Sequence, residues 1–241
     1  MHTETQQLTG AYIAAQAPDD VRAAFIRRTY QHLAYAILAF MAIEFVLFKS
    51  GVAEAMTRTM LGGRWAWLIV LGAFMVVSFI ADKWAQSATS RSTQYIGLGV
   101  YVLAEAIIFV PLLYIAANFA SPDTIPIAAV ITGLLFLGLT VTAFTTRKDF
   151  SFLGGILKIG GCIALGVIVC SIVFGFSLGL IFSSIMVAFA GTAILYTTSR
   201  IIHNYNTEQH VAAALSLFAS VALLFWYVLR ILIALSSVAD D

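Results

Sequence analysis

Charge is scarce in this chain. Only 10% of its 241 residues are charged and 61% are apolar, whereas soluble domains carry about 25% charged residues. One soluble core cannot bury that much apolar surface, so the composition indicates a polytopic membrane protein whose main partner is the lipid bilayer. The formal net charge of +1 gives no reason to expect binding to nucleic acid.

Cysteine is also scarce, with Cys162 and Cys170 as the two examples. They lie eight residues apart in one apolar run, roughly 12 Å along a helix, which is beyond the reach of a disulfide. The four histidines are scattered, and no run has the spacing of a zinc or nucleotide site. We therefore expect neither a bound metal nor a cofactor.

Seven apolar runs are long enough to cross roughly 30 Å of hydrocarbon. The weakest break between them is Gly175-Phe176-Ser177, but joining the runs on either side would need an implausibly long helix. The sequence therefore predicts an all-α bundle of seven transmembrane helices over residues 30–241, preceded by a cytoplasmic N-terminal segment, residues 1–29. The runs are Tyr30–Phe48, Trp65–Ala81, Tyr95–Tyr114, Ile125–Phe144, Phe152–Phe174, Leu178–Thr198 and Val211–Leu235.

The distribution of lysine and arginine predicts the direction of these spans, because loops on the cytoplasmic side are enriched in both. With the N-terminus inside, the inner segments contain eight such residues and the outer segments three. We therefore expect a cytoplasmic N-terminus, with Asp240 and Asp241 outside. The inner eight are Arg22, Arg27, Arg28, Lys83, Arg91, Arg147, Lys148 and Arg200, and the outer three are Lys49, Arg58 and Arg64.

Two features of the sequence suggest activities, but in each case a residue that the chemistry requires is absent or too far away. Residues 175–179 match the G-x-S-x-G pattern of serine hydrolases, but Ser177 is expected in an outer turn, a membrane thickness from the inner histidines that could act as its base. A retinal pigment needs a lysine in its last helix, and Val211–Leu235 contains none. We therefore expect no enzyme and no retinal protein.

Three charges within the apolar runs need an explanation. Glu105 lies halfway through the third run, and Glu44 and Arg230 lie in the outer halves of the first and seventh. An ionisable group at membrane depth costs roughly 2.5–3.5 kcal/mol on insertion scales, so it usually faces a partner or a water-filled cavity. The three could form a structural charge network, or the glutamates could line a cation path that Arg230 opposes.

The seventh run also carries a polar stripe. At 100° per residue, its polar side chains fall within an arc of about 80° and should face the bundle interior. The members of this stripe are Ser216, Ser220, Tyr227 and Arg230.

Two stretches of sequence resemble the Bax inhibitor-1 family, also called the transmembrane Bax inhibitor motif family. The first is the run Thr146-Arg147-Lys148-Asp149-Phe150-Ser151-Phe152-Leu153-Gly154-Gly155, which resembles an inner loop of that family. The second runs from Ile194-Leu195-Tyr196 through Ala213-Ala214-Leu215-Ser216-Leu217-Phe218 to Leu229-Arg230-Ile231-Leu232, and is similar to its last two helices.

The resemblance implies a monomeric seven-helix bundle with the seventh helix in the centre. It also implies that some members are calcium leak channels, in which one aspartate in each of the last two helices senses pH. The matching positions here are Thr197 and Ser220. A threonine and a serine do not titrate near neutral pH, so we expect this switch to be absent and a calcium site there to be disfavoured.

Two functions remain open at this point. The first is a cation leak pathway, with calcium as the candidate ion, in which Glu44 and Glu105 attract the ion and Thr197 and Ser220 form an uncharged inner contact. The second is a non-conducting membrane protein that modulates a membrane protease or a cell-death or stress partner. The short tails favour a bacterial plasma (inner) membrane as the location.

Overall fold

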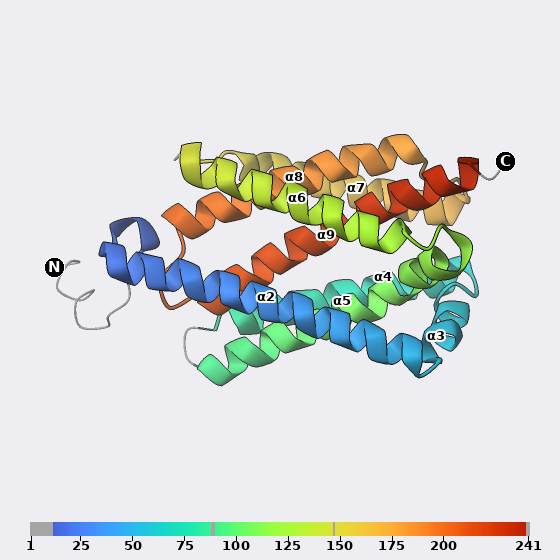
Figure 1. Ribbon diagram of the computed structural model, residues 1–241, viewed down its shortest axis with the longest axis horizontal. Helices are drawn as coiled ribbons and strands as arrows, with labels where there is room; N and C mark the ends of the chain where they lie inside the picture. The colour runs from blue at the N-terminus through green and yellow to red at the C-terminus, as the bar shows by residue number, and fades with distance from the viewer. Residues whose placement is uncertain (1–11, 88–89, 147, 240–241) are drawn as a thin grey trace.

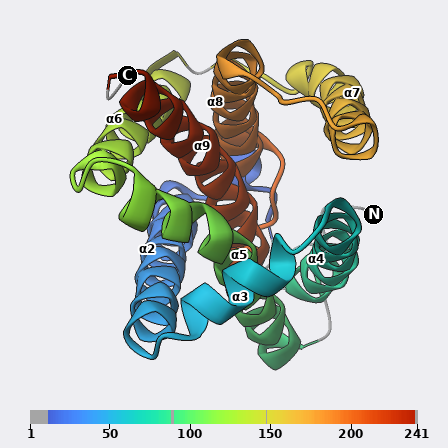
Figure 2. The same ribbon diagram turned by 90° about the vertical axis from the view of Figure 1, so that its right-hand side faces the viewer.

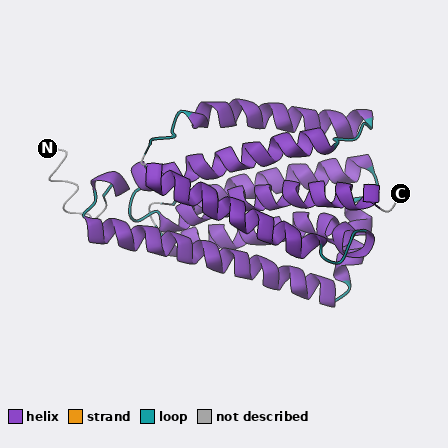
Figure 3. Cartoon of the chain, turned by 45° about the horizontal axis from the view of Figure 1, so that its top comes forward, coloured by secondary structure: helices purple, strands orange, loops and turns teal. Residues whose placement is uncertain are grey.

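A computed structural model describes residues 12–87, 90–146 and 148–239, and this part of the chain is helical apart from short connections (Figure 3). Residues 1–11 of the N-terminal segment, Arg147 of the basic pair, and the C-terminal Asp240 and Asp241 lie outside the described residues. Seven of the described helices are long and apolar enough to cross a membrane. The prediction of an all-α polytopic membrane protein is therefore confirmed.

The seven spans coincide with the predicted runs and extend most of them by a few residues. A 3₁₀ turn, η1 (Ala14–Gln16), precedes the first span, and a short helix, α3 (Val52–Met60), follows it. The spans are α2 (Asp19–Lys49), α4 (Arg64–Ala85), α5 (Arg91–Phe119), α6 (Thr124–Thr146), α7 (Leu153–Phe174), α8 (Leu180–His203) and α9 (His210–Ala239).

Helix α3 is the element that the sequence did not predict. Gly51, at φ +75°, allows the chain to turn sharply between α2 and α3. The helix buries Ala53, Thr57 and Met60 against the bundle, while Arg58 and Glu54 pair at 2.6 Å on its exposed side. With nine residues and two charges, it gives no signal in a search for long apolar runs.

Helix α9 lies at the centre of the bundle (Figures 1 and 2). It packs against α2, α4, α5, α6 and α8, and its N-terminal half buries Val211, Ala213, Leu217 and other side chains completely. Helix α5 is also largely buried and packs against α2, α3, α4, α6 and α9. Together α5 and α9 form the wall between the cavities described below.

Helix α7 lies at the periphery (Figure 2), where it packs mainly against α8 and touches α4. Its outward side chains, including Ile156, Ile159 and Ile163, are exposed and apolar. Such a surface is stable only against hydrocarbon, because in water it would be a large exposed apolar patch. The same holds for exposed apolar side chains on the other spans.

The N-terminal segment docks on the connection between α8 and α9. The Ala14 N–H donates to the Tyr205 carbonyl at 2.9 Å, and the Thr207 N–H donates to the Tyr12 carbonyl at 2.8 Å. The start of α2 therefore lies at the same end of the bundle as the α8–α9 connection, as the six membrane crossings between them, an even number, require.

Candidate functional site in the membrane core

One cavity, of about 450 Å³, lies between α4, α5, α7, α8 and α9. We call it the Arg230 cavity. It brings together four polar side chains singled out in the sequence, Glu105 from α5 and Ser220, Tyr227 and Arg230 from α9. Three members of the polar stripe thus line one cavity, while the fourth, Ser216, lies nearer the N-terminus of α9. The rest of the lining is mainly apolar and includes Trp67 and Trp226.

Glu105 is 94% buried, with 6% of its surface exposed. Its carboxyl has Tyr101, one helical turn earlier on α5, as a hydrogen-bonding neighbour. This local partner was not predicted, although the i, i+4 spacing places the two side chains on one face of the helix. A buried carboxyl next to a hydroxyl is tolerated without a full ion pair.

Arg230 has a partner that the sequence did not indicate. Its Nη2 donates to the main-chain carbonyl of Leu178 at 3.1 Å, in the connection between α7 and α8. Among the described residues, the ion pairs join Arg22 to Asp19, Arg58 to Glu54 and Arg91 to Glu208. Arg230 therefore anchors the α7–α8 connection to α9, and direct pairing with either glutamate is not seen in the described part of the chain.

Glu44 faces a second cavity, which we call the Glu44 cavity. It measures about 510 Å³ and lies between α2, α5, α6 and α9. Phe109 and Ala222 line both cavities, so the α5–α9 wall separates Glu44 from Arg230. The expected meeting of all three charges fails because α2 and α4 pack on different sides of that wall (Figure 2).

Thr197 and Ser220 lie in contact, with their hydroxyl oxygens 3.5 Å apart. The Ser220 hydroxyl also donates to the Ser216 carbonyl at 2.9 Å, and the Ser216 hydroxyl lies 2.9 Å from that of Tyr205. Burial raises the pKa of Tyr205, which lies in the α8–α9 connection, above its ordinary value. Its hydroxyl therefore stays protonated near neutral pH, and this chain of hydroxyls carries no titrating group.

The loop between α6 and α7 explains the motif around residues 148–155. The Phe150 N–H donates to the Ser199 hydroxyl of α8 at 2.9 Å, which fixes the loop to the bundle. Asp149 accepts from the side chain and the main chain of Ser151 at 2.5 and 2.9 Å, which lowers the pKa of its carboxyl. At Gly154, an added Cβ would lie 2.9 Å from the Tyr196 ring, so a larger residue there would have to displace the end of the Tyr196 side chain.

A cluster at the end of the bundle where α2 begins was missed by the sequence analysis. His32 of α2 lies 3.2 Å from the Tyr95 hydroxyl of α5, which lies 3.5 Å from His210 of α9. The two imidazole rings are 5.0 Å apart between centroids. Tyr95 lies 63 positions after His32 and 115 positions before His210 in the chain. Only the packing of three helices could therefore reveal the cluster.

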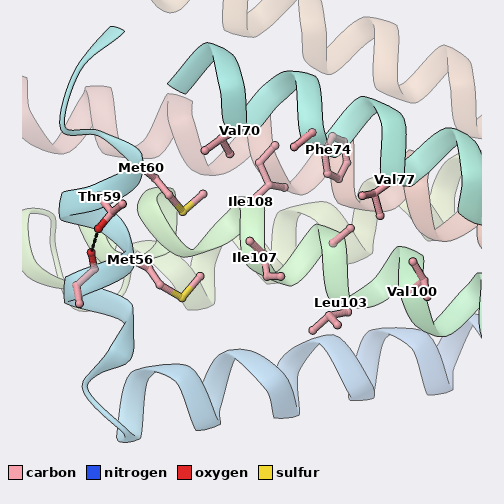
Figure 4. Close-up of a pocket in the computed structure, with 13 residues that line it drawn as sticks. Met56, Thr59, Met60, Val70, Phe74, Val77, Val100, Leu103, Ile107 and Ile108 are labelled. Carbon is pink, nitrogen blue, oxygen red and sulfur yellow. Dashed lines mark hydrogen bonds between the residues drawn. The ribbon is translucent and has the colours of Figure 1, made fainter. Parts of the chain in front are cut away.

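A third cavity, of about 580 Å³, lies between α3, α4 and α5 (Figure 4). Its labelled lining is apolar except for Thr59, whose hydroxyl donates to the Ala55 carbonyl on its own helix. This cavity offers no group for chemistry. Within the described ranges, moreover, no three His, Cys, Asp or Glu side chains lie close enough together to hold a metal ion.

The sequence of this chain is similar to those of known proteins over most of the bundle. A family model described as inhibitor of apoptosis-promoting Bax1 matches residues 22–237. The modulator of FtsH protease YccA from Escherichia coli K12 is 31% identical over 210 residues, covering 86% of this chain and 88% of the relative. The same identity and coverage hold for a protein of E. coli O6:H1 named inner membrane protein YccA.

Two further relatives come from a plant and from another bacterium. Protein LIFEGUARD 4 of Arabidopsis thaliana is 30% identical over 222 residues, covering 88% of this chain and 85% of the relative. An uncharacterised protein of Pseudomonas aeruginosa is 33% identical over 159 residues, covering 66% and 68%. The matched ranges are long enough to include most of the spans.

Proposed function

This chain belongs to the Bax inhibitor-1 family of multi-pass membrane proteins, and from that premise we propose that it modulates a membrane-anchored protease by binding it, without conducting ions under pH control. The observation that supports this proposal is the Thr197–Ser220 contact of 3.5 Å. Two hydroxyls stand where the family resemblance implies a titrating pair of aspartates, so the chain lacks the group that would open a path as pH changes.

The kind of partner is suggested by the relative from E. coli K12 that is named a modulator of FtsH protease. We propose that this chain likewise acts on an FtsH-type protease in a bacterial inner membrane, with its own N-terminus in the cytoplasm. Its action requires no catalysis by the chain itself. In support, Ser177 belongs to the α7–α8 connection, whereas His203 ends α8 at the opposite end of that helix.

Reconstitution tests the proposal. Purified FtsH-type protease, a membrane-protein substrate and this chain are placed in the same proteoliposomes, and the substrate half-life is measured by gel. We expect this chain to change the half-life severalfold and to co-purify with the protease. The variant Glu105→Gln should act like the wild type, because in this role the buried charges are structural. An unchanged half-life together with failure to co-purify would refute the proposal.

A second candidate function, a cation leak, is favoured by one observation. Glu105, Ser220, Tyr227 and Arg230 line the same cavity, which supplies an acidic group and hydroxyls along a possible path. In this role Glu105 attracts the ion, with calcium as the candidate, and Arg230 opposes it. Glu44 would lie outside such a path, since it lines the other cavity.

Calcium flux into liposomes separates the two functions. A leak predicts a flux above that of empty liposomes that falls in Glu105→Gln, because that variant removes the carboxyl that attracts the ion. Flux equal to that of empty liposomes excludes the leak. Flux that survives Glu105→Gln would remove Glu105 from the path.

A further inference from the structure

The Glu44 cavity contains polar atoms whose bonding is unexplained. Neither carboxyl oxygen of Glu44 has a hydrogen-bond partner among the described residues, and the same is true of the Thr132 hydroxyl. Both residues line this cavity and both are more than nine-tenths buried, at 7% and 4% exposed. Buried polar groups are normally paired, and each unpaired one costs free energy. Two such groups from different helices in one cavity indicate a ligand.

The remaining lining of this cavity is strongly aromatic. Phenylalanines line the same cavity as Glu44, and two of their rings, Phe40 and Phe109, meet edge to face with centroids 5.2 Å apart. The electron-rich face of an aromatic ring attracts a cation, and the attraction grows when the cation is desolvated. The phenylalanines that line the cavity include Phe40, Phe48, Phe109, Phe136, Phe218 and Phe225.

The cavity can be reached from the bilayer. At the inner end, Tyr30 of α2 contacts Phe136 and Phe144 of α6 through its ring, which closes the space between these helices. Farther along α2, Met41 and Phe45 line the cavity yet are 58% and 63% exposed. A molecule dissolved in the membrane can therefore enter between α2 and α6 without crossing water.

We propose that the Glu44 cavity binds a lipophilic amine, with the protonated amine on Glu44 and the apolar body among the phenylalanines. The ammonium supplies the counter-charge that a carboxylate at membrane depth requires, and its hydrogen atoms satisfy both carboxyl oxygens and leave one donor for Thr132. Ordinary lipid acyl chains could fill the apolar part, but they leave the carboxyl and the hydroxyl unpaired. Charge complementarity therefore favours the amine.

This site is separate from the proposed protease modulation and from the Arg230 cavity. Glu44 lies on the opposite side of the α5–α9 wall from Glu105, so the two buried carboxyls can be tested independently. The binding experiment also needs neither a protease nor an ion flux. Failure of the amine proposal would accordingly leave the proposed function untouched.

Photo-crosslinking in lipid nanodiscs tests the proposal. The probe is hexadecylamine with a diazirine in its chain, the matched neutral probe is the corresponding hexadecanol, and the nanodisc lipid is phosphatidylcholine. We expect saturable labelling of peptides from α2 and α6 by the amine, with the alcohol weaker by about tenfold or more, because a charge-assisted hydrogen bond is lost. Unlabelled hexadecylamine should compete.

Variants locate the head group. Glu44→Gln keeps the shape of the side chain and should weaken amine labelling by about tenfold, while Thr132→Val should weaken it by a few fold. The matched control is Glu105→Gln, which removes a buried carboxyl from the other cavity and should label like the wild type. Equal labelling by amine and alcohol would mean that the cavity accepts any lipid chain, and would overturn the proposal. So would unchanged amine labelling in Glu44→Gln.

If Glu44→Gln fails to insert into the membrane, the wild-type protein still decides the matter. The ratio of amine to alcohol labelling and the positions of the labelled peptides are then the readouts. Labelling confined to α7 or α8, far from the Glu44 cavity, would count against the site.

Discussion

Thr197 and Ser220 form a hydroxyl contact at the two positions where the family resemblance implies aspartates. Their hydroxyls lie 3.5 Å apart across α8 and α9, and both residues are buried. Two carboxyls at such a distance cannot both ionise freely, so one of them titrates near neutral pH. Two hydroxyls at the same positions join the helices but do not respond to pH.

Restoring both carboxyls should therefore create pH sensitivity. We expect the double variant Thr197→Asp, Ser220→Asp to show calcium flux in liposomes that differs severalfold between about pH 6 and about pH 8, because the pair shares one proton at the lower pH. The response of the pair is the change relative to the wild type, which has no such pair, over the same interval.

The single variants Thr197→Asp and Ser220→Asp serve as controls. Each introduces one carboxyl without a like-charged neighbour, so neither should reproduce the response of the pair. A double variant whose flux has the same pH dependence as that of the wild type would show that pH control needs more than these two positions.

Glycine determines how closely two spans approach. At Gly97 of α5, an added Cβ would lie 2.5 Å from the Ala85 nitrogen and 2.6 Å from the Ala81 oxygen of α4. These are main-chain atoms, so no side-chain rotation can relieve the clash. Small residues allow such contact between membrane helices, where packing rather than water drives association.

The variant Gly97→Ala should be destabilised by about 3 kcal/mol, at the upper end of the usual cost of overpacking. The measurement is thermal unfolding of the purified protein in detergent. Gly99→Ala, two residues later on the same helix, is the matched control, because an added Cβ there meets nothing within 4 Å. Equal unfolding temperatures for the two variants would show that α4 and α5 are not held this closely.

The α6–α7 loop depends on one hydroxyl of α8. The Phe150 N–H donates to Ser199, which is 1% exposed, and leaving that donor unpaired costs free energy. Ser199→Ala should lower the free energy of unfolding by about 1–3 kcal/mol. The control Ser184→Ala removes an exposed hydroxyl of α8 that bonds to Leu180 in its own helix, and should have little effect. Denaturant unfolding of both variants distinguishes these outcomes.

At the scale of the whole molecule, the Glu44 cavity and the Arg230 cavity lie on either side of a wall formed by α5 and α9. Each cavity contains one buried glutamate, and the cations of the chain do not pair with either one in the described residues. Glu105 has Tyr101 nearby, whereas Glu44 has no protein partner in the described ranges. This difference assigns separate roles to the two carboxyls.

The orientation in the membrane is a prediction at this scale. In a variant with Cys162 and Cys170 replaced by alanine, Asp123→Cys in the α5–α6 connection should react with a membrane-impermeant maleimide in intact cells. Lys148→Cys in the α6–α7 loop should react only after permeabilisation. Both positions are exposed, so access decides the result. The reverse pattern would place the N-terminus outside.

The sequence by itself determined the seven spans, the resemblance to the family, and the presence of a threonine and a serine at the two positions where that resemblance implies aspartates. These features are local, because a span needs only enough consecutive apolar residues and a motif needs only particular residues next to one another in the chain. Helix α3 was not predicted from the sequence because it is short and amphipathic. The polar stripe of α9 was also readable, since helical periodicity places Ser220, Tyr227 and Arg230 on one face.

Only the tertiary structure decided which of these groups meet. Lipid is as apolar as the bundle interior, so the apolar residues of a span do not reveal which of its faces is buried or how it is rotated against its neighbours. That rotation separates Glu44 from Arg230, directs Arg230 to Leu178 and gathers His32, Tyr95 and His210. Contacts between residues far apart in the chain depend on helix packing, which no local pattern encodes.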